Sequence, residues 1–298
     1  DVSRQAAEEA AQHVEQLGQP RPTAYWGENA YHQLCQQQGL NLVYVCTDWL
    51  SHVPIALHAM QCGKCVAVEV PAALTLDEIW QLVDTAERTQ QHCMMLENAV
   101  YDHFEMAVRE MVREGLFGEV VHVEGGYAHP IGHRWTPWRM EYNRLTCGDV
   151  YPTNSIGPAC QLLNIHRTDH LHYLTAMHTN PILGKEVYKE VMGKASDSFA
   201  NGDQTSTMIR TMKGKTILIQ HNVMTPRPYS RMFQVVGTRG YAAKYPIHEV
   251  LLHNNSAAKA CIELNDDNMP LSTPQLEKLL SRYAPHFSRE TINLAKQL

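Results

Sequence analysis

The chain has 298 residues, of which 44% are hydrophobic, 19% charged and 8% aromatic, with a formal net charge of -6. This is enough apolar material for one large domain or two smaller ones, and the lack of repeats or low-complexity tracts excludes collagen-like and coiled-coil proteins. No apolar run approaches the roughly 20 residues that cross a bilayer, and Lys and Arg residues are scattered. We therefore expect no membrane span and no nucleic-acid partner.

The first third of the sequence alternates predicted helices with short apolar strands. We expect helices at residues 3–17, 28–38, 53–60, 75–88 and 102–114, and strands at residues 42–47, 65–70 and 93–97. This alternation predicts βαβ units, in which a mostly parallel sheet carries helices on both faces. The continuous apolar run at residues 42–47 predicts a strand that is buried on both faces. Thr75 and Glu78 have the spacing of a capping box at the start of a helix.

Polar residues follow these strands, with Thr47 after the first, Glu69 at the end of the second, and Glu97 and Asn98 at the end of the third. In open parallel sheets, ligands bind at the carboxyl ends of the strands. The sequence therefore predicts a ligand-binding edge at these positions.

After residue 120 the pattern changes to alternating strands. We expect strands at residues 120–127, 208–211, 216–221 and 231–236, with a hairpin turn at residues 213–215. Alternation of this kind favours an antiparallel sheet. The fold class we predict is α/β. A Rossmann-like doubly wound parallel sheet, truncated at its N-terminal part, forms residues 1–120, and an α+β domain with a mainly antiparallel sheet forms residues 121–298.

The beginning of the sequence differs from that of a complete dinucleotide-binding domain, which starts with a strand, a Gly-rich turn and a helix. No GxGxxG pattern occurs, and Asp1 stands directly before a predicted helix. We therefore expect the chain to be a fragment whose exposed sheet edge promotes aggregation. Asp1 either corresponds to the acidic residue that ends the second strand of such a domain or caps the helix.

Cysteine and histidine residues give no closed ligand set for a metal ion. The eight cysteines lie mostly in apolar contexts, and Cys62 and Cys65 have CxxC spacing, which fits either a redox pair or a helix end followed by a turn. His166 and His170 are four residues apart, but no HExxH pattern is present. We expect no metal site.

Eight motifs resemble glycoside hydrolase family 109, whose members are NAD-dependent α-N-acetylgalactosaminidases on the Gfo/Idh/MocA oxidoreductase fold. They run in order over nearly the whole chain: TDWLSH (47–52), VAVEVPAA (66–73), MMLEN (94–98), GGYAH (125–129), TPWR (136–139), GDVYPTN (148–154), GPACQLLNIHR (157–167) and RPYSR (227–231). The resemblance implies that NAD is a recycled cofactor and that the substrate is a small molecule or glycan with a terminal N-acetylgalactosamine.

The resemblance also implies a reaction course. The sugar is oxidised transiently at C3, which acidifies the proton on C2, and removal of that proton expels the glycosidic oxygen from C1. Water then adds to the unsaturated sugar, and the hydride returns to it. The cofactor carries the electron chemistry, while the protein supplies orientation and proton transfer.

Site residues follow from the resemblance position by position. It implies that NAD is contacted by residues at the strand ends, together with Asp1 if that residue is the acidic one: Trp49, Leu50, Ser51, His52, Glu69, Val70 and Asn98. The residues implied to bind the substrate are Tyr127, Arg139, Tyr151, Pro152, Thr153, Asn154 and Tyr229.

Tyr127, Asn154 and Glu97 are the implied catalytic residues. Tyr127 is a candidate base for the C2 proton, although a phenol with a pKa of about 10 needs a lowered pKa or a cationic neighbour. Where the family has Tyr-Pro-Thr-His, this sequence has Asn154. A carboxamide can hydrogen-bond a sugar hydroxyl but cannot exchange a proton near pH 7, a function worth roughly 10²–10⁴-fold in rate. His129 is a candidate for a compensating proton donor.

Two other functions remain open at this stage. A sugar oxidoreductase would release its hydride on the cofactor or on a second substrate, so NADH would accumulate. A sugar-binding protein without catalytic activity is favoured by Asn154 and by the missing Gly-rich turn. A homo-oligomer is compatible with the sequence, which does not indicate a cellular location.

Overall fold

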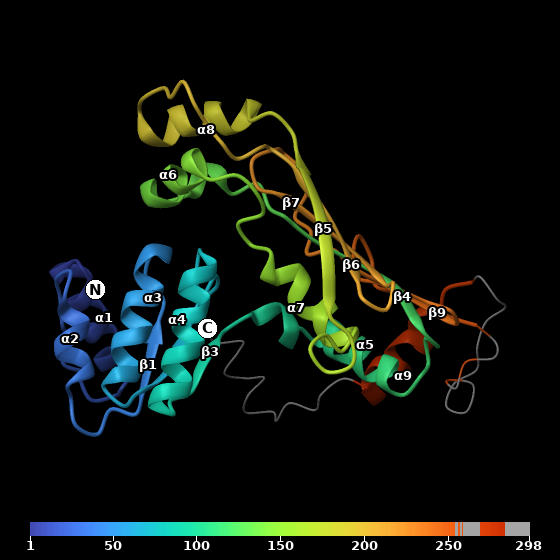
Figure 1. Ribbon diagram of the computed structural model, residues 1–298, viewed down its shortest axis with the longest axis horizontal. Helices are drawn as coiled ribbons and strands as arrows, with labels where there is room; N and C mark the ends of the chain where they lie inside the picture. The colour runs from blue at the N-terminus through green and yellow to red at the C-terminus, as the bar shows by residue number, and fades with distance from the viewer. Residues whose placement is uncertain (254–255, 257, 259–268, 284–298) are drawn as a thin grey trace. The chain divides into compact units, whose positions relative to one another are not determined.

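The computed structural model describes residues 1–253, 256, 258 and 269–283. The chain divides into two compact units, Asp1–Leu96 and Glu97–Leu298, which we describe separately (Figure 1). The sequence places the boundary after residue 120 instead. The segment from residue 97 to 120 groups with the second unit because its helix contributes to the hydrophobic core there.

The first unit is a three-stranded sheet with four helices. Its strands lie in the order β1, β2, β3, and both pairs are parallel. Its elements are α1 (Arg4–Gln16), α2 (Ala30–Cys35), β1 (Leu42–Val45), α3 (Trp49–Gln61), β2 (Cys65–Val68), α4 (Leu76–Thr89) and β3 (Cys93–Met95). The predicted alternation of helices and strands and the parallel sheet are confirmed.

One face of this sheet is buried and the other is exposed. Val43 and Val45 pack into the core with α3, whereas Leu42 and Tyr44 are each 53% exposed. The prediction that residues 42–47 form a strand buried on both faces is therefore wrong. Alternate side chains of a strand point to opposite faces of the sheet whatever their polarity. An unbroken apolar run therefore does not reveal which of the two faces is covered.

Helices α3 and α4 begin at residues whose side chains cap them. Thr75 and Glu78 form the predicted capping box at the start of α4. Asp48 caps α3 by accepting hydrogen bonds from the backbone N–H groups of Leu50 and Ser51. These caps fix the points at which α3 begins after β1 and α4 begins after β2.

The second unit is built on a long mixed sheet. Its described strands are β4 (Val120–Ala128), β5 (Leu171–His178), β6 (Thr205–Thr211), β7 (Thr216–Asn222), β8 (Phe233–Gly237), β9 (Gly240–Ala243) and β10 (Glu249–Leu252). They lie in the order β10, β9, β8, β4, β7, β6, β5, and every neighbouring pair is antiparallel except β4 with β7. This confirms the predicted mainly antiparallel sheet and the hairpin between β6 and β7.

Helices cover parts of this sheet, with α6 and α8 near one end of the long strands and α5 and α9 near the other (Figure 1). The helical segments are η1 (Asn98–Tyr101), α5 (His103–Arg113), η2 (Gly132–Arg134), α6 (Pro137–Leu145), α7 (Thr153–Leu162), α8 (Ile182–Met192) and α9 (Thr273–Tyr283). Among the described residues, no helix is long and apolar enough to cross a membrane.

Two glycines allow α7 to pack closely on β4 and η1. A Cβ atom at Gly125 would lie 2.6 Å from the Cβ of Ser155, and one at Gly157 would lie 3.2 Å from Cγ of Glu97. Real Cβ atoms essentially never make a contact of 2.6 Å, so Gly125 suits only glycine without a shift of the helix, whereas at Gly157 a Cβ would require a small displacement of its neighbour. The close approach brings the start of α7 to the carboxyl end of β4.

A buried ion cluster ties α5 to the segment after β9. Lys244 Nζ lies 2.8 Å from Asp102 Oδ2 and donates to both carboxylate oxygens of Glu105, at 2.9 and 3.0 Å. Burial raises the pKa of Glu105 to about 7 although Lys244 acts in the opposite direction. For the more exposed Asp102, hydrogen bonds and the charge of Lys244 outweigh burial and lower the pKa.

Candidate functional site

Tyr127 and His129 lie two residues apart on β4 and its continuation, so their side chains point to the same face. Tyr127 Oη lies 3.0 Å from His129 Nδ1. Burial, reinforced by the neighbouring tyrosines, raises the pKa of Tyr127 to about 12, which outweighs the opposite effect of Arg231. Burial and the charge of Arg134 lower the pKa of His129. The lowered phenol pKa that a free tyrosinate base requires is therefore not found, but an imidazole nitrogen lies within hydrogen-bond distance of the phenol.

Tyr151 stands beside this pair, just before α7. Its ring centroid lies 5.1 Å from that of Tyr127. Burial raises the pKa of Tyr151, while the charge of Arg139 and hydrogen bonds from Arg139 and Trp135 lower it. Arg139 also covers the ring of Trp138 at 4.3 Å. Arg139 and Tyr151, separated by a loop, thus lie in contact.

Tyr229 completes an aromatic group around His129. The two ring centroids are 4.9 Å apart in an edge-to-face arrangement, and Tyr229 is 45% exposed. A shallow hollow adjoins Tyr127, and Gly126, Arg227 and Met232 are among the residues that line it. Five predicted or suggested site residues therefore gather on one unit: Tyr127, His129, Arg139, Tyr151 and Tyr229.

Glu97 and Asn154 form a separate contact at the start of α7. With the Asn154 carboxamide oriented so that its nitrogen faces the carboxylate, Nδ2 donates to Glu97 Oε1 at 2.8 Å and to Oε2 at 3.2 Å. Glu97 Oε1 also accepts from the backbone N–H of Ala99, and Glu97 is 4% exposed. Pro152 is the N-cap of α7 and Thr153 its first residue. The Asn154 side chain is thus fixed by a buried carboxylate.

Asp149 and His221 lie behind Tyr151, and the sequence did not single out either. The carboxylate of Asp149 accepts from the backbone N–H of Tyr151 at 2.8 Å, and His221 Nε2 lies 3.9 Å from Asp149 Oδ1. Within the described part of the chain, Asp149 Oδ2 and both ring nitrogens of His221 have no hydrogen-bond partner. A buried polar group without a partner costs about 1–3 kcal/mol. Only the position of Asp149 inside the motif at residues 148–154 could have drawn attention to this pair.

The predicted NAD-contacting residues of the first unit gather at the carboxyl ends of β1 and β2. Leu50 is 66% exposed in the first turn of α3, and Glu69, which follows β2, accepts a hydrogen bond from Tyr44. Val70 is half-buried beside Glu69, and Ser51 donates to the capping residue Asp48. An exposed apolar side chain beside polar ones at this edge is suited to a dinucleotide.

Other predicted cofactor residues have structural contacts. His52 is 1% exposed, and its ring nitrogens lie 2.8 Å from the carbonyl oxygen of Pro71 and 3.2 Å from that of Thr47. It therefore connects the loops after β1 and β2. Trp49 is also buried, at 3% exposure.

Asp1 and Asn98 lie outside this group. Asp1 Oδ1 accepts from the backbone N–H of Ser3, and Ser3 itself is the N-cap of α1. Asn98 belongs to the second unit, where its Oδ1 accepts a hydrogen bond from Arg231 at 3.3 Å.

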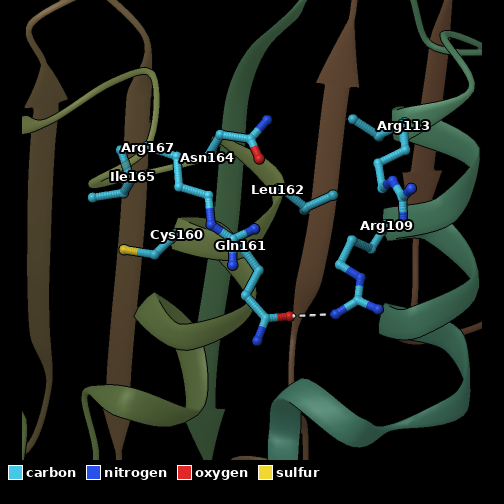
Figure 2. Close-up of a pocket in the computed structure, with 9 residues that line it drawn as sticks. Arg109, Arg113, Cys160, Gln161, Leu162, Asn164, Ile165 and Arg167 are labelled. Carbon is cyan, nitrogen blue, oxygen red and sulfur yellow. Dashed lines mark hydrogen bonds between the residues drawn. The ribbon is translucent and has the colours of Figure 1, made fainter.

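A larger cavity of the second unit contains none of the predicted site residues. It has a volume of about 800 Å³ and lies between α5 and the end of α7 (Figure 2). Arg109, Arg113 and Arg167 line it, and Arg109 donates to Gln161 at 3.0 Å. We place the site at the tyrosine group instead, because the pKa shifts and the buried unpaired polar atoms are found there.

No group of three or more His, Cys, Asp or Glu residues is placed to hold a metal ion within the ranges that the structure describes. Cys62 and Cys65 are both free thiols at the end of α3 and the start of β2.

Family models match most of the chain. Residues 131–266 match the C-terminal domain of glycosyl hydrolase family 109, and residues 2–97 match the NAD-binding Rossmann fold of the oxidoreductase family. Residues 131–266 thus correspond to the C-terminal domain of glycosyl hydrolase family 109, and the chain is similar to proteins of that family. The first unit is accordingly an NAD-binding Rossmann domain, as the sequence predicted.

Curated members of family 109 are similar over most of this chain. Glycosyl hydrolase family 109 protein 1 of Bacteroides fragilis (strain YCH46) is 49% identical over 287 residues, which are 94% of this chain and 62% of that protein. An alpha-N-acetylgalactosaminidase of Bacteroides fragilis (strain ATCC 25285) is 40% identical over 289 residues, 92% of this chain and 65% of that protein. The chain spans less than two thirds of the length of these relatives.

Solved structures show the same fold as this chain. An inositol dehydrogenase homolog from Azotobacter vinelandii, solved with NADH and myo-inositol, aligns with a TM-score of 0.65 at 16% identity. The alignment covers 94% of this chain and 74% of that one. At this identity the likeness establishes the fold.

Proposed function

We propose that the protein is an NAD-dependent α-N-acetylgalactosaminidase that recycles its cofactor. The observation that carries the proposal is the group of Tyr127, His129, Tyr151 and Arg139 on one unit, in a chain that matches the C-terminal domain of family 109. The 40% identity to an alpha-N-acetylgalactosaminidase supports the choice of sugar.

The first unit offers a partial fit to NAD. Ser51, Glu69 and the exposed Leu50 stand at the carboxyl edge of a parallel sheet, where dinucleotides bind. No Gly-rich phosphate turn is present in the sequence, so these residues are the ones that would hold the cofactor from this side. When bound, NAD supplies reversible oxidation of the sugar at C3, which makes the C2 proton acidic.

Tyr127 and His129 would move the C2 proton together. The raised pKa of Tyr127 keeps its phenol protonated at neutral pH, while the lowered pKa of His129 keeps the imidazole neutral. As Tyr127 Oη accepts the proton from C2, its own proton passes across 3.0 Å to His129 Nδ1. Tyr127 remains a neutral phenol, and His129 becomes the acid that can return a proton. The pair thus avoids a free tyrosinate.

Arg139, Tyr151 and Tyr229 would hold the sugar. The Arg139 guanidinium presents several N–H donors in a fixed plane, which suits the hydroxyls or the acetamido carbonyl of the substrate. Exposed aromatic rings such as Tyr229 offer an apolar surface to a sugar face.

Asn154 would bind substrate without exchanging protons. Because its Nδ2 donates to Glu97, its Oδ1 is directed away from the carboxylate and can accept from a sugar hydroxyl. Glu97 in this arrangement orients Asn154. Proton transfer then falls to the Tyr127–His129 pair.

The experiment is hydrolysis of a nitrophenyl α-N-acetylgalactosaminide by the full-length protein, with an Asn154→His variant beside it. We expect nitrophenol release by the natural protein without net NADH accumulation. Activity in the variant alone would contradict catalysis by the natural protein and identify it as a sugar-binding homologue. Net NADH formation on a free sugar, with no nitrophenol released, would instead identify a sugar oxidoreductase, the function that the oxidoreductase-family match of residues 2–97 favours as an alternative.

A further inference from the structure

Asp149 and His221 concentrate buried polar atoms beneath the tyrosine group. His221 is 1% exposed on β7, and the Asp149 side chain is 8% exposed before α7. In register, His221 lies beside Tyr127 on β4 and beside Thr205 on β6. Thr205 Oγ1 is buried too, and like the His221 ring nitrogens it has no hydrogen-bond partner among the described residues. Buried polar groups nearly always have a hydrogen-bond partner, so several unpaired ones at one place call for an explanation.

The pair is free of net charge in one protonation state only. With one proton between them, either the carboxylic acid or the imidazole donates and the other accepts, so a small closure of the 3.9 Å separation would join His221 Nε2 to Asp149 Oδ1 without a net charge in the interior. With two protons, imidazolium and carboxylic acid both present donors, and with none they place an uncompensated carboxylate in the interior. Burial thus selects the single-proton state.

The pair also touches the site. Asp149 accepts from the backbone N–H of Tyr151 at 2.8 Å, and the rings of Tyr151 and His221 have centroids 6.3 Å apart. Tyr151 in turn contacts Tyr127. A change in the charge of the pair therefore acts directly on both tyrosines.

We propose that Asp149 and His221 hold a single proton between them, position Tyr151, and keep the floor of the tyrosine site uncharged. In this role both are positioning residues. The proton between them does not depend on the proposed glycosidase function, and only its effect on turnover rests on that function. Through this pair the site gains an imidazole and a carboxyl group, although Asn154 itself cannot exchange protons.

Burial is the main influence on the protonation of Asp149 and His221. His221 lies beside Tyr127 of β4 and Thr205 of β6 in register, Tyr151 contacts both members of the pair, and Arg139 acts on Tyr151. Burial raises the pKa of Asp149 and lowers that of His221. The backbone N–H of Tyr151 opposes the effect of burial at Asp149, because its hydrogen bond lowers the pKa of that carboxyl group.

A titration of the imidazoles by nuclear magnetic resonance tests the pair without substrate or turnover. In protein labelled with ¹⁵N in histidine, the His221 signal is assigned as the one missing from a His221→Gln variant. We expect the His221 imidazole to stay neutral down to pH 5. Its ¹⁵N chemical shift should change near pH 7, where Asp149 loses its proton. A His221 that becomes protonated between pH 6 and 7, like an exposed histidine, would overturn the proposal even if no Asp149 variant folds.

Asp149→Asn and Asp169→Asn are matched variants. Each aspartate accepts backbone hydrogen bonds and has a buried Oδ2 with no hydrogen-bond partner among the described residues, but Asp169 lies at the turn before β5 and away from the tyrosines. We expect Asp149→Asn to abolish the inflection of His221 near pH 7 and Asp169→Asn to preserve it. An inflection that survives Asp149→Asn would contradict the shared proton.

Turnover supplies the second readout. Above about pH 7 the pair loses its shared proton and places an uncompensated carboxylate beneath Tyr151, which disturbs the position of that ring, so kcat of the natural protein should fall above that pH. In Asp149→Asn that limb should move upward by at least one pH unit, while KM changes less than twofold. An unchanged limb in an active variant would refute the positioning role. A natural protein that is inactive but shows the expected titration would refute the glycosidase and leave the pair standing.

Discussion

Two buried polar clusters in the second unit differ in how completely their polar atoms are paired. Around Lys244, one ammonium group bonds the carboxylates of Asp102 and Glu105 at 2.8–3.0 Å. Around His221, the nearest carboxylate oxygen is 3.9 Å away and several polar atoms have no partner among the described residues. Fully paired charges hold helix and sheet together, whereas incompletely paired groups are found where a site must change its protonation.

Mutations in the two clusters should therefore affect different properties of the protein. Changes around Lys244 should act on stability and leave the chemistry intact. Changes around Tyr127 and His221 should act on turnover and its pH dependence.

The largest effect is expected from Tyr127→Phe. Removing the hydroxyl interrupts proton transfer to His129, so nitrophenol release should fall by about 10²–10⁴-fold. The free energy of unfolding, measured with urea, should change by only about 1 kcal/mol, since one hydrogen bond is lost. Tyr173→Phe, on the exposed strand β5, is the matched control and should keep full activity. A Tyr127→Phe protein with undiminished turnover would remove Tyr127 from the mechanism.

Lys244→Met should give the largest loss of stability. The substitution keeps the length of the side chain but leaves Glu105, which is 5% exposed, without its cation. Breaking a buried pair in this way lowers the free energy of unfolding by about 3–5 kcal/mol. A second change, Glu105→Gln, should recover part of that loss in a double-mutant cycle. A loss below about 1 kcal/mol would mean that the cluster is open to solvent.

Asp149→Asn should change how stability depends on pH. Burial raises the pKa of Asp149 from 3.8 to about 7, so the folded state binds its proton more tightly than the unfolded state does. Stability from this group is therefore present below pH 3.8 and is lost as the pH rises through 7, by up to about 4 kcal/mol. His221 acts in the opposite sense: its pKa is lowered to about 4, so its contribution is lost as the pH falls below 6.5.

Urea unfolding at pH 5 and pH 8 measures this difference. The natural protein should lose more stability between the two values than Asp149→Asn does. Equal losses would indicate that Asp149 titrates as an exposed aspartate.

A smaller effect is expected from Gly125→Ala. The new Cβ would lie 2.6 Å from the Cβ of Ser155, which pushes α7 away from β4. Overpacking of this kind costs about 1–3 kcal/mol, and it should weaken substrate binding through Tyr151 more than it slows the reaction. Gly214→Ala, at the hairpin turn, would strain a residue with φ +84° without moving α7 and is the control. Unchanged KM in Gly125→Ala would argue against the placement of Tyr151 by α7.

The sequence predicts the framework of the first unit well because local signals determine it. The capping box of Thr75 and Glu78 and the apolar core positions of β1 and β2 are contained in short segments. The prediction from the sequence is wrong for the outer face of β1, since Leu42 and Tyr44 are apolar yet exposed. Only the packing of neighbouring elements decides which face is covered.

In the second unit, the sequence predicts the hairpin of β6 and β7 but not the parallel pairing of β4 with β7, which joins residues nearly a hundred positions apart. Tyr127, Arg139, Tyr151 and Tyr229 follow from the family motifs. The contact of Asn154 with Glu97 and the position of His221 beneath Tyr151 depend on how closely α7 packs on β4. No local pattern specifies that distance.

The measurement that tests the central claim most directly is hydrolysis of the nitrophenyl glycoside by the full-length protein in D₂O. If Tyr127 and His129 remove and return the C2 proton, the N-acetylgalactosamine released should carry deuterium at C2, because both groups exchange protons with solvent. Tyr127→Phe should suppress release and exchange together. Hydrolysis that proceeds with protium retained at C2 would show that the glycosidic bond is cleaved without C2 proton removal, and would contradict the account.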